Sequence, residues 1–477
     1  MPLDTQLARA SIREIGRLFR QRKLSPLELT RGMLERIARL NPKLNAYITV
    51  CEEQALKAAS KAESELCVAK NRKSHRDRGP LQGIPISLKD NIFTRGLRTT
   101  AGSKILCDFI PTHDAPVVSA LKTAGAILLG KANLHEFAYG VTTNNPHFGP
   151  ARNPWDLSRI PGGSSGGSAA ALAAGLCYGS IGTDTGGSIR IPAGLCGVVG
   201  LKPGLGSVSA EGVIPLSATL DFVGPLARTV EDAALLYEVV VPDEKNAPRS
   251  QFRRARNIRT HKIHLGILKN FFLDTVSEEV LASFDAALKL LKKSGARLKE
   301  ISIPLLAQTE DAGNQIAWAE ATLFHQQSGW FPQRSADYGE DVRTRLEMGL
   351  KISAIAYLQA METRRNFIAE FHNTLRESDL DAVVFPTTPI AAPLIDQESV
   401  AINGTNHPAR ALLLRNNRPA NLGALPAISV PCGLTPGGLP IGLQFMAAAQ
   451  DELLLIQIAN SFSQQLGPLS LPETLFD

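Results

Sequence analysis

Two glycine-rich turns between Ile160 and Gly206 constrain the fold of this chain more than any other feature. The first, PGGSSGGSAAALAAG, runs into an alanine-rich stretch over residues 168–174 that predicts a closely packed helix. The second, GSIGTDTGGSIRIPAGLCGVVGLKP, joins a predicted strand near residues 180–183 to another glycine turn. Glycines let backbone N–H groups point inward at close range, as an anion-stabilising nest requires. The segment therefore predicts a helix, a strand and a candidate site in their connecting turns.

Predicted helices and strands alternate along much of the chain. Helices are expected at residues 114–125, 229–240, 277–293 and 346–375, and strands at residues 83–90, 126–129, 262–268, 382–385, 428–430 and 441–445. This alternation predicts an α/β fold in which a large, mixed, mostly parallel twisted sheet is covered by helices on both faces.

We expect a single domain over residues 1–477. The first 70 residues predict three helices that form an N-terminal helical arm, and the second helix begins at Ser25-Pro26-Leu27-Glu28, a capping box with proline at the first helical position. Residues 71–465 are expected to form the α/β core. The basic, proline-containing stretch near residues 242–260 is interpreted as an excursion from that core.

The composition is that of an ordinary globular protein, with 44% apolar and 20% charged residues. The net charge of +6 is spread along the chain, and the basic stretches at 70–78 and 253–264 hold few aromatic residues, so no nucleic-acid site is expected. The six cysteines form no C-x-x-C pair, which favours free thiols in the cytoplasm. Neither a signal peptide nor a membrane-spanning helix is predicted, so no membrane contact is expected.

Several short motifs lack the partners that their functions require. GGSSGGS has no Lys-Ser/Thr of a phosphate-binding loop, and Asp184-Thr185-Gly186 occurs once, whereas an aspartic protease needs two such triplets. Ser119-Ala120-Leu121-Lys122 lies on a predicted amphipathic helix, and His135-Glu136 lacks the second histidine of a zinc-binding H-E-x-x-H motif. None of them is taken as the functional site.

The ordered motifs from Leu27 to Gln465 resemble the amidase signature family of amide-bond hydrolases. The matching pieces are GIPISLKDNI, GKANLHEFAYGVTTNNPHFGPARNPW, PGGSSGGSAAALAAG, GTDTGGSIRIPAGLCGVVGLKP, and LPAISVPCG followed by GLPIGLQF. The spacing also fits, with 75 positions from Lys89 to Ser164 and 24 from Ser164 to Ser188. The resemblance implies the amidase signature fold and hydrolysis of amide carbon–nitrogen bonds.

The resemblance also implies a Ser-Ser-Lys triad. In this triad Ser188 attacks the substrate carbonyl, Ser164 bridges, and Lys89 acts as the base. Ser164 is implied to sit on a cis peptide bond. The implied oxyanion hole consists of the backbone N–H groups of Thr185, Gly186, Gly187 and Ser188.

Other residues receive supporting roles. Ser165, Asp184 and Arg190 are interpreted as holding the two glycine turns in register through hydrogen bonds and charge pairing. The resemblance places Tyr139 and Gly140 beside the scissile bond, in the substrate pocket, although a core aromatic is an equal interpretation of Tyr139.

The chemistry of these residue types suits the implied triad. A free serine is a weak nucleophile, and apart from His135 and His147 no histidine lies near the serines, so another base is needed. A lysine can accept a proton only when neutral, which burial achieves by lowering its pKa from about 10.4. Taken alone, Lys89 at the end of an apolar strand is better explained as a surface lysine; in combination with the family pattern the triad is favoured. This chemistry requires no metal and no organic cofactor.

The expected substrate is a small amide. Residues 316–334 and 338–357 are expected to shape the pocket, and their aromatic residues give it an apolar character; they include Trp318, Phe324, Trp330 and Phe331. We therefore expect hydrolysis of small aryl or alkyl amides through a serine acyl-enzyme, with carbamates and esters as side substrates. A homodimer is left open.

The alternative is a glutaminase A-type subunit of a tRNA-dependent amidotransferase. Glutaminase subunits of the family carry an acidic residue before the P-A-N-L segment to hold the amino group of glutamine, and residues 412–419 contain none. This departure argues against glutaminase activity and against partner subunits. A metal-dependent amidohydrolase is disfavoured because ligand clusters are missing.

Overall fold

The structure is a computed structural model that describes residues 5–68, 77–242, 263–467, 469 and 472. Apart from residue 242, the expected excursion near residues 242–260 lies outside the described residues. The N-terminal elements are α1 (Thr5–Arg9), α2 (Ile12–Arg20), α3 (Pro26–Leu44), β1 (Tyr47–Val50) and α4 (Glu52–Val68). The next are β2 (Pro85–Lys89), α5 (Pro116–Thr123), β3 (Ile127–Ala132), α6 (Gly166–Ala173), β4 (Gly179–Asp184), α7 (Arg190–Cys196), β5 (Val199–Lys202), β6 (Phe222–Ala227) and α8 (Val230–Val240).

The remaining elements form the C-terminal half of the sheet and its helices. They are β7 (His264–Leu268), α10 (Glu278–Lys293), β8 (Arg297–Ile301), α11 (Thr309–Gln327), α12 (Glu340–Gly349), α13 (Ala354–Glu377), β9 (Ala382–Pro386), β10 (Ser399–Ile402), β11 (Thr405–Pro408), α14 (Ala409–Arg415), α15 (Arg418–Leu422), β12 (Ala427–Leu434), β13 (Pro440–Ala447) and α16 (Glu452–Leu466).

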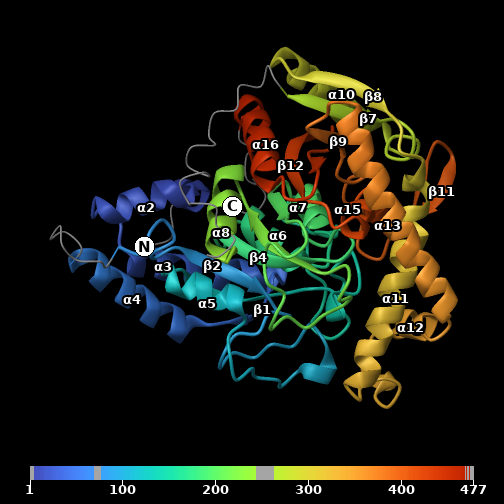
Figure 1. The fold of residues 1–477 in the computed structure, drawn as a ribbon. Coiled ribbons are helices and arrows are strands. Elements are labelled where there is room, and N and C mark those ends of the chain that lie inside the picture. The colour runs from blue at the N-terminus through green and yellow to red at the C-terminus, as the bar shows by residue number, and fades with distance from the viewer. Residues whose placement is uncertain (1–4, 69–76, 243–262, 468, 470–471, 473–477) are drawn as a thin grey trace.

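One eleven-stranded sheet organises the molecule, in the order β1-β3-β2-β4-β6-β5-β12-β13-β9-β7-β8 (Figure 1). Its parallel pairs form two blocks, β3-β2-β4 and β9-β7-β8. The other neighbouring pairs are antiparallel. The expected α/β class with a large mixed sheet is therefore confirmed, and β10 and β11 make a separate two-stranded hairpin.

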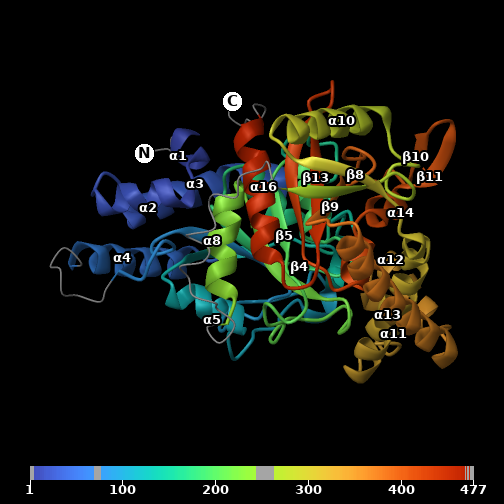
Figure 2. The same ribbon diagram turned by 45° about the horizontal axis from the view of Figure 1, so that its top comes forward.

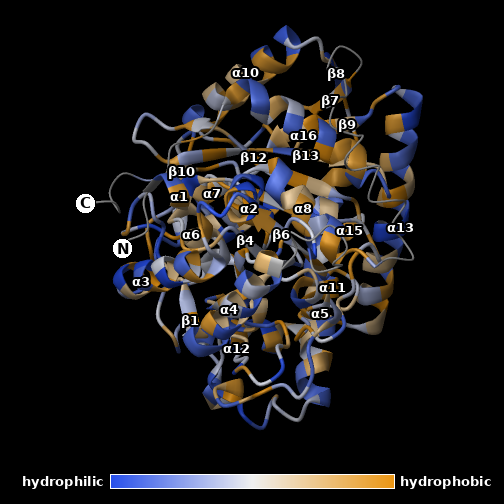
Figure 3. Ribbon diagram, turned by 90° about the vertical axis from the view of Figure 1, so that its left-hand side faces the viewer, coloured by the Kyte–Doolittle hydropathy of each residue, from blue (hydrophilic) through white to orange (hydrophobic). Residues whose placement is uncertain are grey.

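Helices cover both faces of this sheet. Every residue of β2, β4, β9 and β13 is buried, which requires cover on both sides. Helices α8, α10 and α16 pack along the strands in Figure 2, whereas α6 and α7 pack against each other and against strands at the centre of the sheet. In Figure 3 the central strands are mainly hydrophobic, while the outer helices carry both hydrophilic and hydrophobic residues.

The N-terminal segment contributes a strand to the sheet as well as helices. The Ser25 capping box is present, since Ser25 Oγ accepts the Glu28 N–H at 3.0 Å and the Glu28 carboxylate accepts the Ser25 N–H at 3.1 Å. Strand β1 was not predicted because its four residues are too few to show a period. It pairs antiparallel with β3 and so ties the N-terminal helices to the core.

The single helix expected over residues 346–375 is wrong, because two helices, α12 and α13, occupy this region. Gly349 ends α12 where it meets α11, and a Cβ atom at Gly349 would lie 2.1 Å from Thr322 Oγ1. Ser353 then begins α13, since its hydroxyl accepts the Ala356 N–H at 3.1 Å. The helical period runs through this break, which is why sequence reasoning missed it.

Three further observations bear on expectations from the sequence. Among the described helices, none is both long and apolar enough to cross a bilayer. All six cysteines are free thiols. Within the described ranges, no group of three or more His, Cys, Asp or Glu side chains is arranged to hold a metal ion.

Candidate active site

Lys89 ends β2 in the interior of the protein and is completely buried. Its ammonium donates hydrogen bonds of 2.7 Å to Ser164 Oγ and to Thr183 Oγ1. Burial lowers the pKa of Lys89 to about 7, against the opposing influence of the Asp221 and Asp184 carboxylates. A large fraction of this amine is therefore neutral near pH 7, as a proton acceptor must be.

Asp90 fixes the backbone directly after Lys89. Its buried carboxylate accepts hydrogen bonds from the Thr100 N–H at 2.9 Å and the Thr100 hydroxyl at 2.5 Å. It also lies 3.5 Å from the buried ammonium of Lys131 on the neighbouring strand β3. These contacts anchor the end of β2, so the position of the Lys89 side chain is set by strand pairing on one side and by this network on the other.

Ser164 and Ser165 lie immediately before α6, on the first glycine turn. The peptide bond between Gly163 and Ser164 is cis. The Ser165 N–H donates to the Ser188 carbonyl at 3.1 Å, and the Ser165 hydroxyl donates to the Thr183 carbonyl at 3.2 Å. Ser165 therefore ties the first glycine turn to the second. Within the described residues, no hydrogen bond joins the Ser164 and Ser188 hydroxyls.

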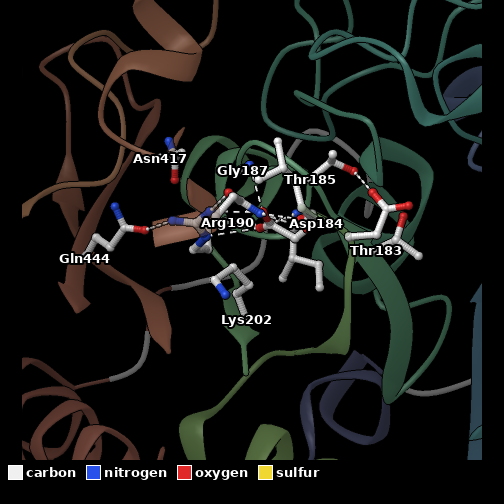
Figure 4. Close-up of polar contacts among 12 residues, drawn as sticks. Thr183, Asp184, Thr185, Gly187, Arg190, Lys202, Asn417 and Gln444 are labelled. Atoms are coloured by element: carbon white, nitrogen blue, oxygen red, sulfur yellow. Dashed lines mark hydrogen bonds and ion pairs between the residues drawn. The ribbon is translucent and has the colours of Figure 1, made fainter. Parts of the chain in front are cut away.

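The second glycine turn is built around a buried ion pair between Asp184 and Arg190 (Figure 4). The guanidinium donates to both carboxylate oxygens, at 3.0 Å and 2.9 Å, while the N–H groups of Gly187 and Ile189 donate to them at 2.7 Å and 3.0 Å. Burial alone would raise the pKa of Asp184, but the Arg190 charge outweighs it and holds that pKa well below its usual range. The turn is therefore held by a charged, multiply bonded carboxylate.

Two amide side chains complete this network, and sequence reasoning assigned a role to neither. Arg190 donates to Gln444 Oε1 at 2.7 Å (Figure 4). It also donates to Asn421 Oδ1 at 2.6 Å. Asn421 Nδ2 in turn donates to the Asp184 carbonyl at 2.8 Å. Gln444 lies in GLPIGLQF, one of the motifs that carry the family resemblance, whereas Asn421 belongs to the P-A-N-L segment. An amide side chain within an apolar motif was the available signal for Gln444.

The backbone of this turn offers donors to a substrate oxygen, but not at all four expected positions. Gly187 has φ +121°, a conformation that favours glycine, and its N–H is committed to Asp184. This expected oxyanion-hole donor is therefore already used within the protein. Within the described part of the chain, the N–H groups of Thr185, Gly186 and Ser188 donate to no other group of the protein.

Asp221, which the sequence did not single out, fixes the loop that faces this turn. Its carboxylate accepts the Thr185 hydroxyl at 2.5 Å and the N–H groups of Leu216 and Ser217 at 2.8 Å and 3.1 Å. Burial raises the pKa of Asp221 to about 6. At neutral pH the carboxylate is therefore mostly ionised and favours the protonated form of Lys89.

A small cavity lies beside Ser188, and its lining includes Tyr139 and Gly140, the two pocket residues that the resemblance implies. Its lining consists of Ala138, Tyr139, Gly140, Val141, Thr185, Gly186, Ser188, Leu216, Ala317, Trp318, Arg410, Leu414 and Arg418. Of the four aromatic residues expected to shape the pocket, only Trp318 is among these. Phe324, Trp330 and Phe331 instead pack in a hydrophobic cluster with Phe137. Core packing therefore explains most of them.

The imidazole rings of the nearby histidines contact carboxylates rather than serine hydroxyls. His135 Nε2 lies 2.7 Å from an Asp341 carboxylate oxygen, and His147 Nε2 lies 2.8 Å from one of Glu136. Among the described residues, the side chain that contacts the Ser164 hydroxyl is Lys89, which fits the reasoning that a base other than histidine is required.

Comparison with known proteins gives a consistent picture. The family model described as Amidase matches residues 28–456. The A-type subunit of the Glutamyl-tRNA(Gln) amidotransferase of Carboxydothermus hydrogenoformans is 36% identical over 483 residues, covering 95% of this chain and 96% of that protein. A crystal structure of an amidase matches with a TM-score of 0.88 at 33% identity, covering 96% of this chain and all of that one. The crystal structure of the corresponding A-type subunit from Thermotoga maritima matches with a TM-score of 0.78 at 35% identity, covering 99% of each chain.

These relatives correct two expectations. The expected hydrolysis of small aryl or alkyl amides, with carbamates and esters as side substrates, is wrong, because the curated relatives that match almost the whole chain are A-type subunits of an amidotransferase. The missing acidic residue in 412–419 was a poor criterion, since it reports one contact to the substrate and nothing of the shared acyl chemistry. The expectation that the protein binds only a small-molecule substrate and no nucleic acid is wrong for the same reason. The relatives are named as subunits of an amidotransferase that acts on a tRNA.

The family and its general activity follow from these observations together. The motifs that carry the resemblance fold into one site, in which Lys89 contacts Ser164 and the second glycine turn presents Ser188 to a cavity. The matching proteins act on amide carbon–nitrogen bonds, and this chain is an enzyme of that class. The chain belongs to the amidase family, in its amidase signature form.

Proposed function

We propose that this chain is the glutaminase A-type subunit of a tRNA-dependent amidotransferase. It hydrolyses the side-chain amide of glutamine and releases ammonia for use on a tRNA-bound substrate by partner subunits. The observation that carries the proposal is full-length similarity to curated A-type subunits, together with a buried lysine in contact with the bridging serine. In this proposal the protein works in the cytoplasm, where its six free cysteines stay reduced.

The proposed reaction begins at Ser188, whose hydroxyl oxygen attacks the amide carbonyl. Its proton passes to Ser164, and the Ser164 proton passes to Lys89 across the 2.7 Å contact. The N–H groups of Thr185, Gly186 and Ser188 donate hydrogen bonds to the developing oxyanion. When the tetrahedral intermediate collapses, the proton returns through Ser164 to the leaving nitrogen, ammonia departs, and water then hydrolyses the acyl-enzyme by the same route.

The test is release of ammonia from glutamine, measured for the chain alone and with the other subunits of the amidotransferase. We expect turnover that Ser188→Ala lowers by roughly 10⁴-fold or more, because the acyl-enzyme cannot form without the nucleophile. Ser119→Ala, an exposed serine on α5, serves as the matched control and keeps full activity. Absence of glutamine turnover under both conditions, or equal turnover in Ser188→Ala, contradicts the proposal.

A further inference from the structure

Two arginines form part of the wall of the cavity beside Ser188. Arg410 comes from α14 and Arg418 from α15, and both line the same cavity as Ser188 and Gly186. A Cβ atom placed on Gly186 would lie 3.2 Å from the Arg418 guanidinium carbon, so this positive charge reaches the turn that presents the nucleophile. Neither arginine was assigned a role from the sequence, where Arg418 appears only as part of LLLRNNRP.

The two guanidinium groups lack carboxylate partners. Within the described residues, Arg410 makes no hydrogen bond and no ion pair, and its Nε is shielded from solvent. Arg418 is 4% exposed and donates to Asn314 Oδ1 at 2.8 Å and to the Gly313 carbonyl at 3.4 Å, while its Nε has no partner. Arg418 is a buried charge without a counter-ion, which is costly, and the half-buried Arg410 adds a second unpaired charge to the same wall. Such a wall fits an anionic ligand.

The neighbouring groups reinforce this positive character. Arg345, a third nearby arginine, is already paired with Asp341 at 2.9 Å and donates to the Tyr139 carbonyl. Tyr139 also lines the cavity. Its hydroxyl is buried, has no hydrogen-bond partner among the described residues, and can donate a hydrogen bond to a ligand. Burial and the two other arginines lower the pKa of Arg410 to about 9, which leaves it charged at neutral pH.

Among its described residues, the lining offers no carboxylate to hold a positive charge. Its described residues include no Asp or Glu, and Leu414 stands on α14 between the two arginines. Glu310 and Asp184 are the carboxylates that act on Arg418, and neither is part of the lining. An ammonium group in this cavity would therefore meet two like charges and no carboxylate.

We propose that Arg410 and Arg418 bind a carboxylate of the amide substrate and that the pocket makes no use of an α-amino group. This inference rests on the proposed function, because it assigns the specificity of the same acyl pocket. The preferred substrates are then terminal amides of dicarboxylic acids. Glutaramate, which is glutamine without its amino group and carries a net charge of −1, is a better substrate than zwitterionic glutamine, and both are better than uncharged butyramide.

The experiment compares kcat/KM for glutaramate, glutamine and butyramide, using the chain together with its partner subunits. A hydrogen bond to a charged group contributes about 1.5–3 kcal/mol, so we expect glutaramate to exceed butyramide by roughly 10- to 150-fold, with glutamine between them. Arg410→Met lowers kcat/KM for glutaramate by a similar factor and leaves butyramide within about twofold. Arg365→Met, an exposed arginine on α13, is the matched control and changes none of the three.

Two outcomes overturn the inference: a preference for glutamine or butyramide over glutaramate, or an equal loss for all three substrates in Arg410→Met. Binding of glutaramate to Ser188→Ala, measured by calorimetry with and without Arg410→Met, separates recognition from turnover. Arginine-dependent binding without any turnover in the wild type contradicts the proposed function and supports the inference. Ser188-dependent hydrolysis of glutamine with no advantage for glutaramate supports the function and contradicts the inference.

Discussion

Arg190 and Arg418 are both buried and both lie beside the turn that carries Ser188, yet their surroundings are opposite. Arg190 donates to Asp184, Asn421 and Gln444, so its charge is neutralised and its donors are occupied. Arg418 and its neighbour Arg410 face the cavity with no carboxylate partner within the described residues. The comparison shows that burial of an arginine does not reveal its role; the role follows from whether the protein itself supplies the counter-charge.

The difference divides the site into two sides. On the catalytic side, the contacts of Lys89, Ser165, Asp184 and Arg190 are made within the protein, which holds the geometry before any substrate arrives. On the binding side, Tyr139 and the two cavity arginines keep unused donors. Substitutions on the two sides should therefore have different consequences for turnover and for stability.

The largest effect is expected on the catalytic side, from Lys89→Met. Removal of the base should lower kcat by roughly 10³- to 10⁴-fold while the fold is retained, because methionine fills a similar volume. Steady-state kinetics and circular dichroism check this. Turnover within tenfold of the wild type would show that Lys89 is not the base.

The wild-type pH profile tests the same residue without a substitution. Since only the neutral amine accepts a proton and burial lowers the pKa of Lys89 to about 7, kcat/KM should rise with pH through that region and level off above it. At pH 6 it should be roughly tenfold below the plateau. If kcat/KM did not change from pH 6 to pH 9, deprotonation of Lys89 near pH 7 would not control the reaction.

An intermediate effect is expected from breaking the neutralised pair on the catalytic side. Arg190→Met leaves Asp184 as an unpaired buried carboxylate, so we expect a loss of about 3–5 kcal/mol in the free energy of unfolding. Arg410→Met is the informative contrast, because it removes an unpaired charge and should leave stability unchanged or increased. Urea denaturation measures both. If the two variants were equally destabilised, the comparison between the two sides would fail.

The smallest effect is expected from Tyr139→Phe on the binding side. This change deletes a buried hydroxyl that has no partner within the described residues, so the free energy of unfolding should stay constant or rise by up to about 1 kcal/mol. At the same time KM for glutaramate should increase several-fold, since a donor to the ligand is lost. A clear loss of stability would mean that the hydroxyl has a structural partner.

Much of the fold was accessible from the chain because its signals are local. The capping box at Ser25 is complete within four residues, and the alternation of helices and strands needs only short windows. The break between α12 and α13 was missed because the helical period runs through it, although the Ser353 side chain caps the start of α13. The apolar character of the pocket was overestimated for a similar reason. The period of a helix shows which residues share a face, but not whether that face packs against the core or lines the pocket.

The sequence by itself determined the two glycine turns, the class of the fold, and which serines and lysine carry the family's pattern, because these are encoded in short runs with a recognisable spacing. Only the tertiary structure decided which groups surround them. Asn421 and Gln444 reach Arg190 from 231 and 254 positions away, and Arg410 and Arg418 lie beside Ser188 only because α14 and α15 fold over the second turn. Whether buried charges pair depends on the distances between them across the core. The local sequence pattern does not determine these distances.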